Sequence, residues 1–297
     1  MWYKIKRVLT WQNWVEYQVY PAKPKERIEY KMNADSSGNL YVPIAWVDDL
    51  WNYASYSWDI SVDWWTATTY SWTANASSSI TLSWYTTGTS HIIMITPTTE
   101  DYQWARAYRW YMTSWAPYLT EVIYDGSYVW YWKSATSTGD YFRTAQYRGC
   151  TNLTVPANEY LPDTVTTIWG YFMNAQYNWC TALTYASEEI LPSSVTSIGT
   201  VFRGLQYQNC SSLNEIKWWK DLSTIGSPSM YRYQQFYGCN TNKTVKVLSD
   251  VWTSSSSDAL ENSYVASVYV PSAYLTNFKN TSNYPWVWIT DSKFIWY

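Results

Sequence analysis

All four cysteines of the chain recur at an almost constant spacing, and this period constrains the fold more than any other feature. They lie at Cys150, Cys180, Cys210 and Cys239, which are 30, 30 and 29 residues apart. An aromatic residue precedes each cysteine by eight positions, a glutamine by four and a second ring by three. These columns are Phe142, Phe172, Phe202 and Tyr231, then Gln146, Gln176, Gln206 and Gln235, and then Tyr147, Tyr177, Tyr207 and Phe236. Such a period predicts stacked repeats, because one repeat cannot bury its own apolar side chains while a stack can.

The cysteine column favours a structural interpretation over a chemical one. A metal site is disfavoured because no two cysteines are close in sequence and His91 is the only histidine. Disulfides are not needed where an inward column simply repeats. We therefore expect a core ladder of small buried thiols. Phe142, Phe172 and Phe202 form a second expected core ladder.

The glutamine and tyrosine columns leave two interpretations open. Stacked glutamines can form side-chain ladders, with the rings that follow them packed between repeats. Alternatively, the columns form a recognition face, because tyrosine supplies rigid amphipathic contact area at low entropic cost. On the second interpretation the candidate binding residues are Gln146, Gln176, Gln206, Tyr147, Tyr177 and Tyr207.

Tryptophan stands where the repeats otherwise place glycine. The chain has 23 tryptophans and only 10 glycines. Glycine and asparagine tolerate a left-handed backbone, whereas tryptophan does not. The two columns concerned are Gly149, Trp179, Asn209 and Gly238, and Gly139, Trp169, Gly199 and Gly226.

Our hypothesis is that the gene uses UGA for glycine and that Trp169 and Trp179 are glycines decoded as tryptophan. Outside the repeats, Trp64, Trp65 and Trp84 also occupy turn-like sequences. Pooling the two residue types gives 33 of 297 residues, an ordinary proportion for a loop-rich β protein. The alternative is a genuinely tryptophan-rich protein whose rings stack on sugars.

The whole sequence predicts a mainly β protein in five parts. Residues 1–45 form a β arm, and residues 46–120 form a β-sandwich-like module of short strands. Residues 121–137 form a hairpin around Asp125–Gly126 that caps the repeats of residues 138–251. Residues 252–297 close the chain with a strand at 265–270 and a short helix after Ser272. Further strands are expected at 28–32, 40–44, 59–62, 66–70, 79–83 and 91–95.

Two repeats carry a family resemblance. The pattern Leu-Pro-x-x-Val-Thr-x-Ile occurs at 161–168 and 191–198, and a phenylalanine, a cysteine and a leucine follow each copy. Residues 138–251 therefore resemble the BspA-like leucine-rich repeat family, although the family's repeats are usually shorter. The resemblance implies a right-handed solenoid of about four 30-residue coils with a terminal coil to about residue 280. It also implies surface-associated binding.

Two shorter resemblances concern the N-terminal half. Residues 59–97 resemble a bacterial immunoglobulin-like module. The opening residues, 3–21, are similar to the N-terminal arms of phage tail-associated proteins.

Charge and motifs exclude several classes of function. The net charge of −3 gives no basic footprint for nucleic acid, and no apolar run approaches the ~18 residues of a membrane span. Walker, Rossmann and EF-hand patterns are missing from the sequence, and His91 lacks a nucleophile motif around it, so we expect neither an enzyme nor a cofactor.

The expected function is non-catalytic recognition or adhesion on a bacterial surface or a phage particle. The partner would be a protein or glycan on another cell surface. Alternatives are a glycan-active enzyme and a purely structural protein that self-assembles through its N-terminal half. The expected location is extracellular, on a cell surface or in a virion. The first residues do not have the pattern of a secretory signal, so the sequence does not indicate the export route.

Overall fold

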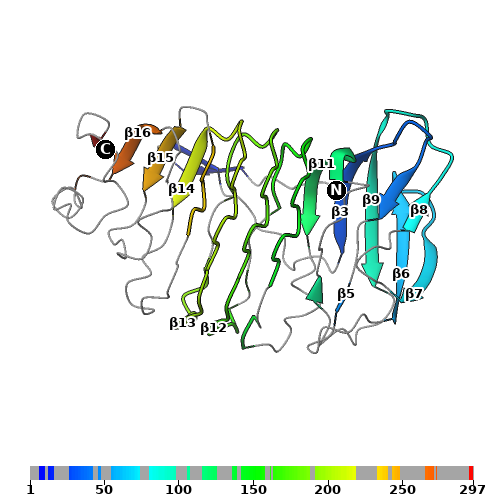
Figure 1. Ribbon diagram of the computed structural model, residues 1–297, viewed down its shortest axis with the longest axis horizontal. Helices are drawn as coiled ribbons and strands as arrows, with labels where there is room; N and C mark the ends of the chain where they lie inside the picture. Colours follow the sequence, from blue (N-terminus) through cyan, green and yellow to red (C-terminus); the bar gives the residue numbers. More distant parts are fainter. Residues whose placement is uncertain are drawn as a thin grey trace.

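The described residues of the computed structural model are mainly β, with almost no helix and no closed barrel. Figure 1 shows the strands side by side along the long axis of the molecule, from β7 at one end to β16 near the other. The one named helical element, η1 (Ala116–Tyr118), has three residues. The described residues are 7–10, 13–16, 27–42, 46–47, 55–73, 80–97, 106–107, 116–125, 136–138, 142–157, 161, 163–187, 191–218, 233–239, 243–247, 265–270, 272 and 294–296.

A five-stranded antiparallel sheet forms most of the N-terminal half, in the order β11-β3-β9-β6-β7. A second sheet pairs β4 with β8, and both sheets bury side chains in one apolar cluster. Successive side chains of a strand point to opposite faces of the sheet, and this alternation places every second residue of β3 in the core. Ile28, Tyr30 and Met32 point inward and are fully buried. The bounds are β3 (Ile28–Asn33), β4 (Leu40–Val42), β6 (Ser55–Val62), β7 (Thr68–Thr73), β8 (Ile80–Leu82), β9 (Ser90–Pro97) and β11 (Leu119–Asp125).

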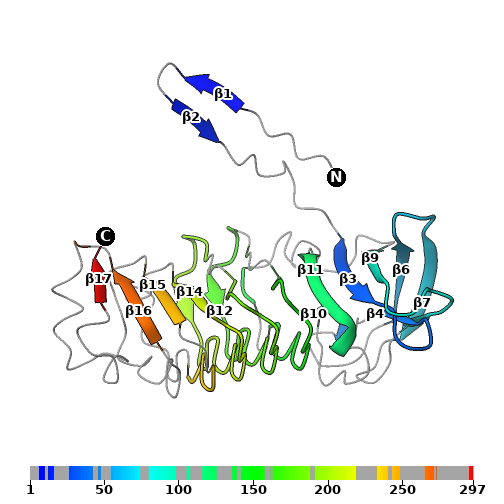
Figure 2. The same cartoon turned by 90° about the horizontal axis from the view of Figure 1, so that it is seen from above.

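These strands confirm the strands expected at 28–32, 59–62, 79–83 and 91–95 to within a few residues. Two smaller pairs complete this half of the molecule. Hairpin β1 (Arg7–Thr10) and β2 (Asn13–Glu16) stands clear of the body in Figure 2. Strands β5 (Trp46–Val47) and β10 (Arg106–Ala107) pair with each other.

The turn at residues 35–38 forms around the carboxylate of Asp35. Oδ1 of Asp35 accepts the backbone N–H groups of Ser37 and Asn39 at 2.8 and 2.9 Å, and Gly38 has a φ of 75°. The Tyr41 hydroxyl donates to Oδ2 at 2.6 Å. This hydroxyl and the backbone donors lower the pKa of Asp35 to about 2. The turn that joins β3 to β4 is therefore fixed by hydrogen bonds to one ionised side chain.

Successive 30-residue repeats stack in parallel along a first row of backbone contacts. The N–H of Thr154 donates to Thr120 O, that of Asn214 to Thr184 O and that of Thr244 to Asn214 O, each at 2.9 Å. The row continues into a parallel sheet in the order β14-β15-β16-β17. Its strands are β14 (Glu215–Trp218), β15 (Lys243–Val247), β16 (Val265–Val270) and β17 (Phe294–Trp296).

A second row of contacts lies at the opposite end of each repeat. The N–H of Thr166 donates to Thr136 O, and that of Thr196 donates to Thr166 O, both at 2.8 Å. The row includes the parallel pair β12 (Thr167–Ile168) and β13 (Ser197–Ile198), which lie at the lower edge of Figure 1. Ile168 and Ile198 point inward there and are buried.

Four turn segments, residues 142–149, 171–179, 201–209 and 233–238, connect the two rows. Their backbone is left-handed at alternate positions, with φ of 57°, 52° and 50° at Tyr171, Met173 and Ala175. A left-handed conformation costs an L-residue roughly 1–2 kcal/mol. Hydrogen bonding offsets this cost, because every backbone N–H from Met173 to Cys180 has an acceptor.

The acceptors follow the same alternation. The N–H groups of Ala175, Tyr177 and Trp179 donate to Gly204, Gln206 and Gln208 of the next repeat at 2.8 to 2.9 Å. The intervening N–H groups donate to the carbonyl three residues earlier in their own segment. The turn segments thus join neighbouring repeats as a strand would, although they are not extended.

Strand β11 links the two halves of the molecule. One of its edges pairs with β3, and the other makes a parallel bridge from Glu121 to Val155 of the first repeat. The hairpin expected over 121–137 stays a prediction, because residues 126–135 lie outside the described part. Strand β3, from the part of the chain expected to form the N-terminal arm, is an inner strand of the five-stranded sheet, between β11 and β9.

Leucine stands three positions after three of the four cysteines, at Leu153, Leu183 and Leu213, and offers a direct test of the stack. Leu183 is fully buried among the neighbouring columns, so Leu183→Ala removes apolar contacts and leaves a cavity. Substitutions of this kind cost about 2–5 kcal/mol. Chemical denaturation should show this loss, whereas the exposed neighbour Thr184→Ala should change stability by no more than about 0.5 kcal/mol. Equal losses in the two variants would contradict the stacked arrangement.

Candidate functional site

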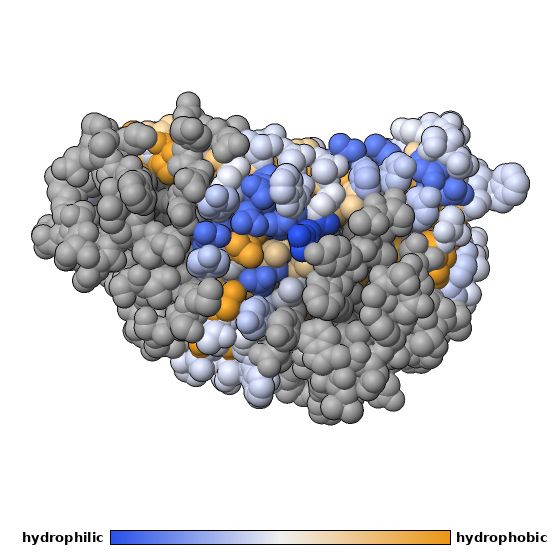
Figure 3. Space-filling model, in the orientation of Figure 1, coloured by the Kyte–Doolittle hydropathy of each residue, from blue (hydrophilic) through white to orange (hydrophobic). Residues whose placement is uncertain are grey.

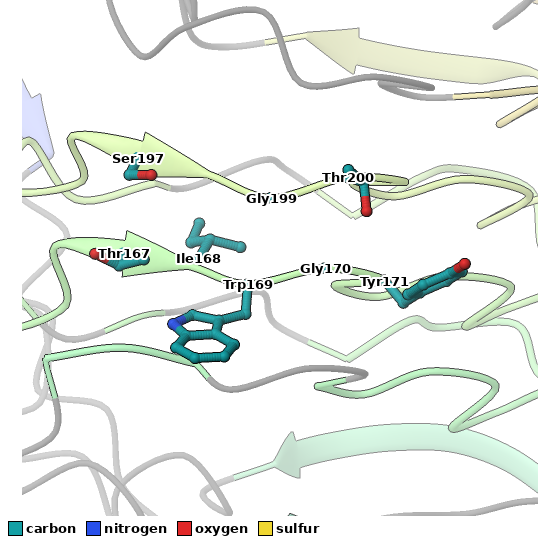
Figure 4. A pocket seen from close by; sticks show the side chains of 8 residues that line it. All are labelled: Thr167, Ile168, Trp169, Gly170, Tyr171, Ser197, Gly199 and Thr200. Atoms are coloured by element: carbon teal, nitrogen blue, oxygen red, sulfur yellow. The ribbon is translucent and has the colours of Figure 1, made fainter.

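A shallow hollow opens beside the second row of contacts, where two repeats meet. Its volume is about 380 Å3, and it is formed by β12, β13 and the residues that follow them. Figure 4 shows the ring of Tyr171 at one end and that of Trp169 along one side. Both rings are exposed, at 38 % and 49 %. The lining residues are Thr167, Ile168, Trp169, Gly170, Tyr171, Ser197, Gly199 and Thr200.

The polar groups of the hollow are hydroxyls and backbone groups, and its lining carries no charged side chain. Thr167, Ser197 and Thr200 supply three aliphatic hydroxyls, and Tyr171 supplies a phenol. Uncharged hydroxyls beside exposed rings suit a neutral, polar ligand with one apolar face. The arrangement offers binding groups without a general acid or base among them.

Glycine is required in the backbone of the hollow. A Cβ added to Gly199 would lie 2.6 Å from the backbone nitrogen of Gly170 and from the carbonyl carbon of Trp169. The N–H of Gly199 donates to Ile168 O at 2.6 Å, and that of Tyr171 donates to Thr200 O at 2.9 Å. These contacts hold the two repeats close together and fix the positions of the lining residues.

The glutamine column forms a buried ladder. The side-chain amide of Gln176 donates to Gln146, that of Gln206 to Gln176 and that of Gln235 to Gln206, at 3.2, 3.0 and 2.8 Å. All four side chains are buried. The geometry supports the ladder interpretation and gives Gln146, Gln176 and Gln206 no surface with which to contact a partner.

The tyrosine column is also internal. Tyr147, Tyr177, Tyr207 and Phe236 stack with ring centroids 5.2 to 5.4 Å apart. The backbone N–H groups of Ala157 and Ser187 donate to the hydroxyls of Tyr177 and Tyr207 at 2.9 and 3.0 Å. These two hydroxyls therefore accept hydrogen bonds from the backbone of the repeats. The rings of Tyr147, Tyr177 and Tyr207 are buried.

The four cysteines are free and fully buried. The thiols of Cys180, Cys210 and Cys239 donate to the carbonyls of Tyr147, Tyr177 and Tyr207 in the preceding repeat, each at 3.1 Å. Burial, followed by the hydrogen bond with the Cys150 thiol, raises the pKa of Cys180 well above the usual range of a thiol. Cys180 is thus held as the protonated thiol, and the column is a ladder of buried thiols.

The phenylalanine column is accompanied by buried arginines that the sequence pattern did not single out. Phe142, Phe172 and Phe202 stack at centroid distances of 5.6 and 5.2 Å. The guanidinium carbons of Arg143 and Arg203 lie 5.4 and 5.3 Å from the rings of Phe142 and Phe202. Both arginines are 1 % exposed. A signal was present in the sequence, because each arginine follows a phenylalanine at the repeat period.

His91 lies in β9 and belongs to a network with Asp63 and Thr89. Its Nδ1 is 2.6 Å from Asp63 Oδ2, and its Nε2 is 2.7 Å from Thr89 Oγ1. The Thr89 hydroxyl donates its single proton to Thr86 O at 2.5 Å. Because that proton is already held by a carbonyl, Thr89 is not poised as a nucleophile, and the network instead ties β9 to the β6–β7 turn.

The two tryptophans singled out in the repeats are exposed. Trp179 has a φ of 66° and is 52 % exposed, whereas Trp169 flanks the hollow. Neither is a core anchor. The other column members Tyr231, Gly139 and Gly226, and the helix expected after Ser272, lie outside the described residues.

No family model, curated protein or solved structure matches the chain. Within the described residues, no group of three or more histidine, cysteine, aspartate or glutamate side chains is placed to hold a metal ion. None of the helices in that same part of the chain has the length and apolarity of a membrane crossing.

Thiol reactivity tests the cysteine ladder. In the native protein all four thiols should resist alkylation at pH 8, and all should react in denaturant, as counted by mass spectrometry. The raised pKa also predicts a pH effect on stability. Unfolded thiols ionise near pH 8.5 while the folded thiol of Cys180 stays protonated, so stability should fall as pH rises above about 8.5. Rapid native labelling would contradict the buried ladder.

Removal of one rung tests the glutamine ladder. In Gln206→Leu, the buried Oε1 of Gln176 and the amide of Gln235 each lose a partner, and an unsatisfied buried group costs about 1–3 kcal/mol. Urea denaturation should therefore show a clear loss of stability, with Gln206→Glu behaving no better. An unchanged midpoint in Gln206→Leu would show that the ladder does not contribute to stability.

Proposed function

We propose that this protein is a non-catalytic recognition or adhesion protein of a bacterial surface or phage particle, and that it binds a glycan through the repeats. The observation that carries the proposal is the hollow between two repeats, which is lined by three aliphatic hydroxyls and two exposed rings. Sugars present both hydroxyls and an apolar ring face, so they match such a lining.

The size and charge of the hollow support a small neutral segment of a larger ligand. Its volume of about 380 Å3 falls in the ordinary range of ligand sites, and its lining residues are uncharged. Figure 3 shows strongly hydrophilic residues gathered over the repeats on the face turned to the viewer, with small apolar areas between them. A polar partner suits this surface better than an apolar one.

Regular spacing supports an extended ligand. Thr136, Thr166 and Thr196 occupy equivalent places in three successive repeats, and all three are exposed. Thr166 Oγ1 and Thr196 Oγ1 donate to the carbonyl of the preceding repeat at 3.2 and 3.3 Å. A ladder of equivalent hydroxyls beside the hollow fits a polymer whose own units repeat.

The repeats themselves fit a leucine-rich-repeat-type solenoid of the BspA-like kind, and this assignment is part of the proposal. Supporting it are the parallel backbone rows, the buried leucine, cysteine and phenylalanine columns, and the short parallel strands β14 and β15 in the first row and β12 and β13 in the second. Solenoids of this type bind along an extended surface, because each repeat contributes an equivalent strip. An extracellular, cell-surface or virion location follows from such a role.

Binding to a glycan array, followed by titration of the best ligand, tests the proposed function. Tyr171→Ala should weaken the affinity at least tenfold, about 1.4 kcal/mol, because its ring borders the hollow. Tyr185→Ala is a matched control, since Tyr185 is similarly exposed at 40 % but lies on the first row of contacts. If Tyr185→Ala weakens binding and Tyr171→Ala does not, the hollow is not the site. Turnover of any arrayed glycan would instead favour the enzyme alternative.

A further inference from the structure

Three tryptophans adopt a backbone conformation that elsewhere in this chain belongs to glycine. Trp64, Trp84 and Trp179 have φ of 69°, 80° and 66°. The left-handed glycines of the described chain span 69° to 77°, whereas all other left-handed residues lie between 46° and 61°. Tryptophan therefore groups with glycine in φ. A bulky aromatic residue has no intrinsic preference for a left-handed φ close to that of glycine.

The solvent exposure of these three tryptophans is a second unusual feature. Trp64, Trp84 and Trp179 are 53 %, 98 % and 52 % exposed. Trp65 and Trp169 are exposed as well, and no tryptophan with a described side chain lies in the core. Tryptophan ordinarily buries a large apolar area and contributes strongly to core energetics. In the described part of the chain, the core is built without tryptophan.

The turn between β6 and β7 shows what the backbone requires. Asp63 and Trp64 both have positive φ, at 50° and 69°, and the N–H of Trp65 donates to Val62 O at 3.0 Å. A type I′ turn requires positive φ at both of its central residues, and Asp-Gly is a preferred pair there. The chain has Asp-Trp at these positions.

The repeats supply an internal comparison for Trp179. Its equivalents Gly149, Asn209 and Gly238 have φ of 77°, 61° and 69°, so the column needs a left-handed residue in every repeat. Trp169 is equivalent to Gly199, where an added Cβ would lie 2.6 Å from the backbone of the preceding repeat. Both columns are built for residues without a large side chain.

We infer that glycine is the native residue at positions 64, 84, 169 and 179, and that the gene encodes it with UGA. The inference goes beyond the proposed function and does not depend on it. It changes the binding surface, because the hollow would keep Tyr171 and the hydroxyls but lose the indole of Trp169. The native ligand would then be held by hydroxyls and a single ring.

Reading the codons is the first test. The genomic sequence should have TGA at positions 64, 84, 169 and 179, and peptides of the protein from its source should contain glycine there. TGG at any two of these positions would overturn the inference.

Stability provides an independent readout in protein produced with tryptophan at all four positions. Trp64→Gly, Trp84→Gly and Trp179→Gly should each raise the midpoint of thermal unfolding by a few degrees, because each relieves a strained backbone. Trp65→Gly is the control. Trp65 is 78 % exposed but its φ lies outside the left-handed region, so the midpoint should stay the same or fall. A lower midpoint in all three test variants would show that tryptophan fits these turns, against the inference.

Discussion

Backbone hydrogen bonding between the turn segments is the interaction on which the rest of the repeat architecture depends. Because alternate residues are left-handed, N–H groups such as that of Tyr177 reach the next repeat, while the intervening ones close turns within the segment. The backbone N–H groups from Met173 to Cys180 are thereby satisfied away from water. The side-chain ladders of glutamine, tyrosine, cysteine and phenylalanine follow from this stacking, since equivalent atoms in neighbouring repeats are brought within contact distance.

Both apolar and polar side chains of the ladders stabilise the stack of repeats. Rings and thiols contribute apolar burial at every repeat, and the amide ladder of Gln146 to Gln235 fixes the register, because a shift would separate donors from acceptors. Tyr177 and Tyr207 contribute in both ways, since their rings stack and their hydroxyls each accept a hydrogen bond from a backbone N–H. The recognition surface that we propose consists of other residues, among them the threonines and serine of β12 and β13 and the residues that follow them.

The sequence predicted the period, the cysteine ladder and most of the N-terminal strands, because each of these depends on spacing along the chain. It did not predict which side chains point outward. In an extended strand, neighbours such as Gln146 and Tyr147 face opposite sides, so one would be exposed. In the turn segments, left-handed residues such as Ala145 keep the backbone from being extended, and both side chains are buried. The pairing of β3 with β11 was likewise hidden, because it joins residues about ninety positions apart. The hollow was missed because its residues come from two repeats, and the column that contains Trp169 and Gly199 was interpreted only as a requirement of the backbone.

Strand β11 has a consequence for the end of the repeat stack. It is antiparallel to β3 on one side and parallel to the first repeat on the other, so it already has its conformation fixed by the sheet of the N-terminal half. The sheet of the N-terminal half thereby covers the open end of the first repeat, whose backbone groups would otherwise lie at an unpaired edge. The stack is consequently closed on this side by a sheet of different architecture.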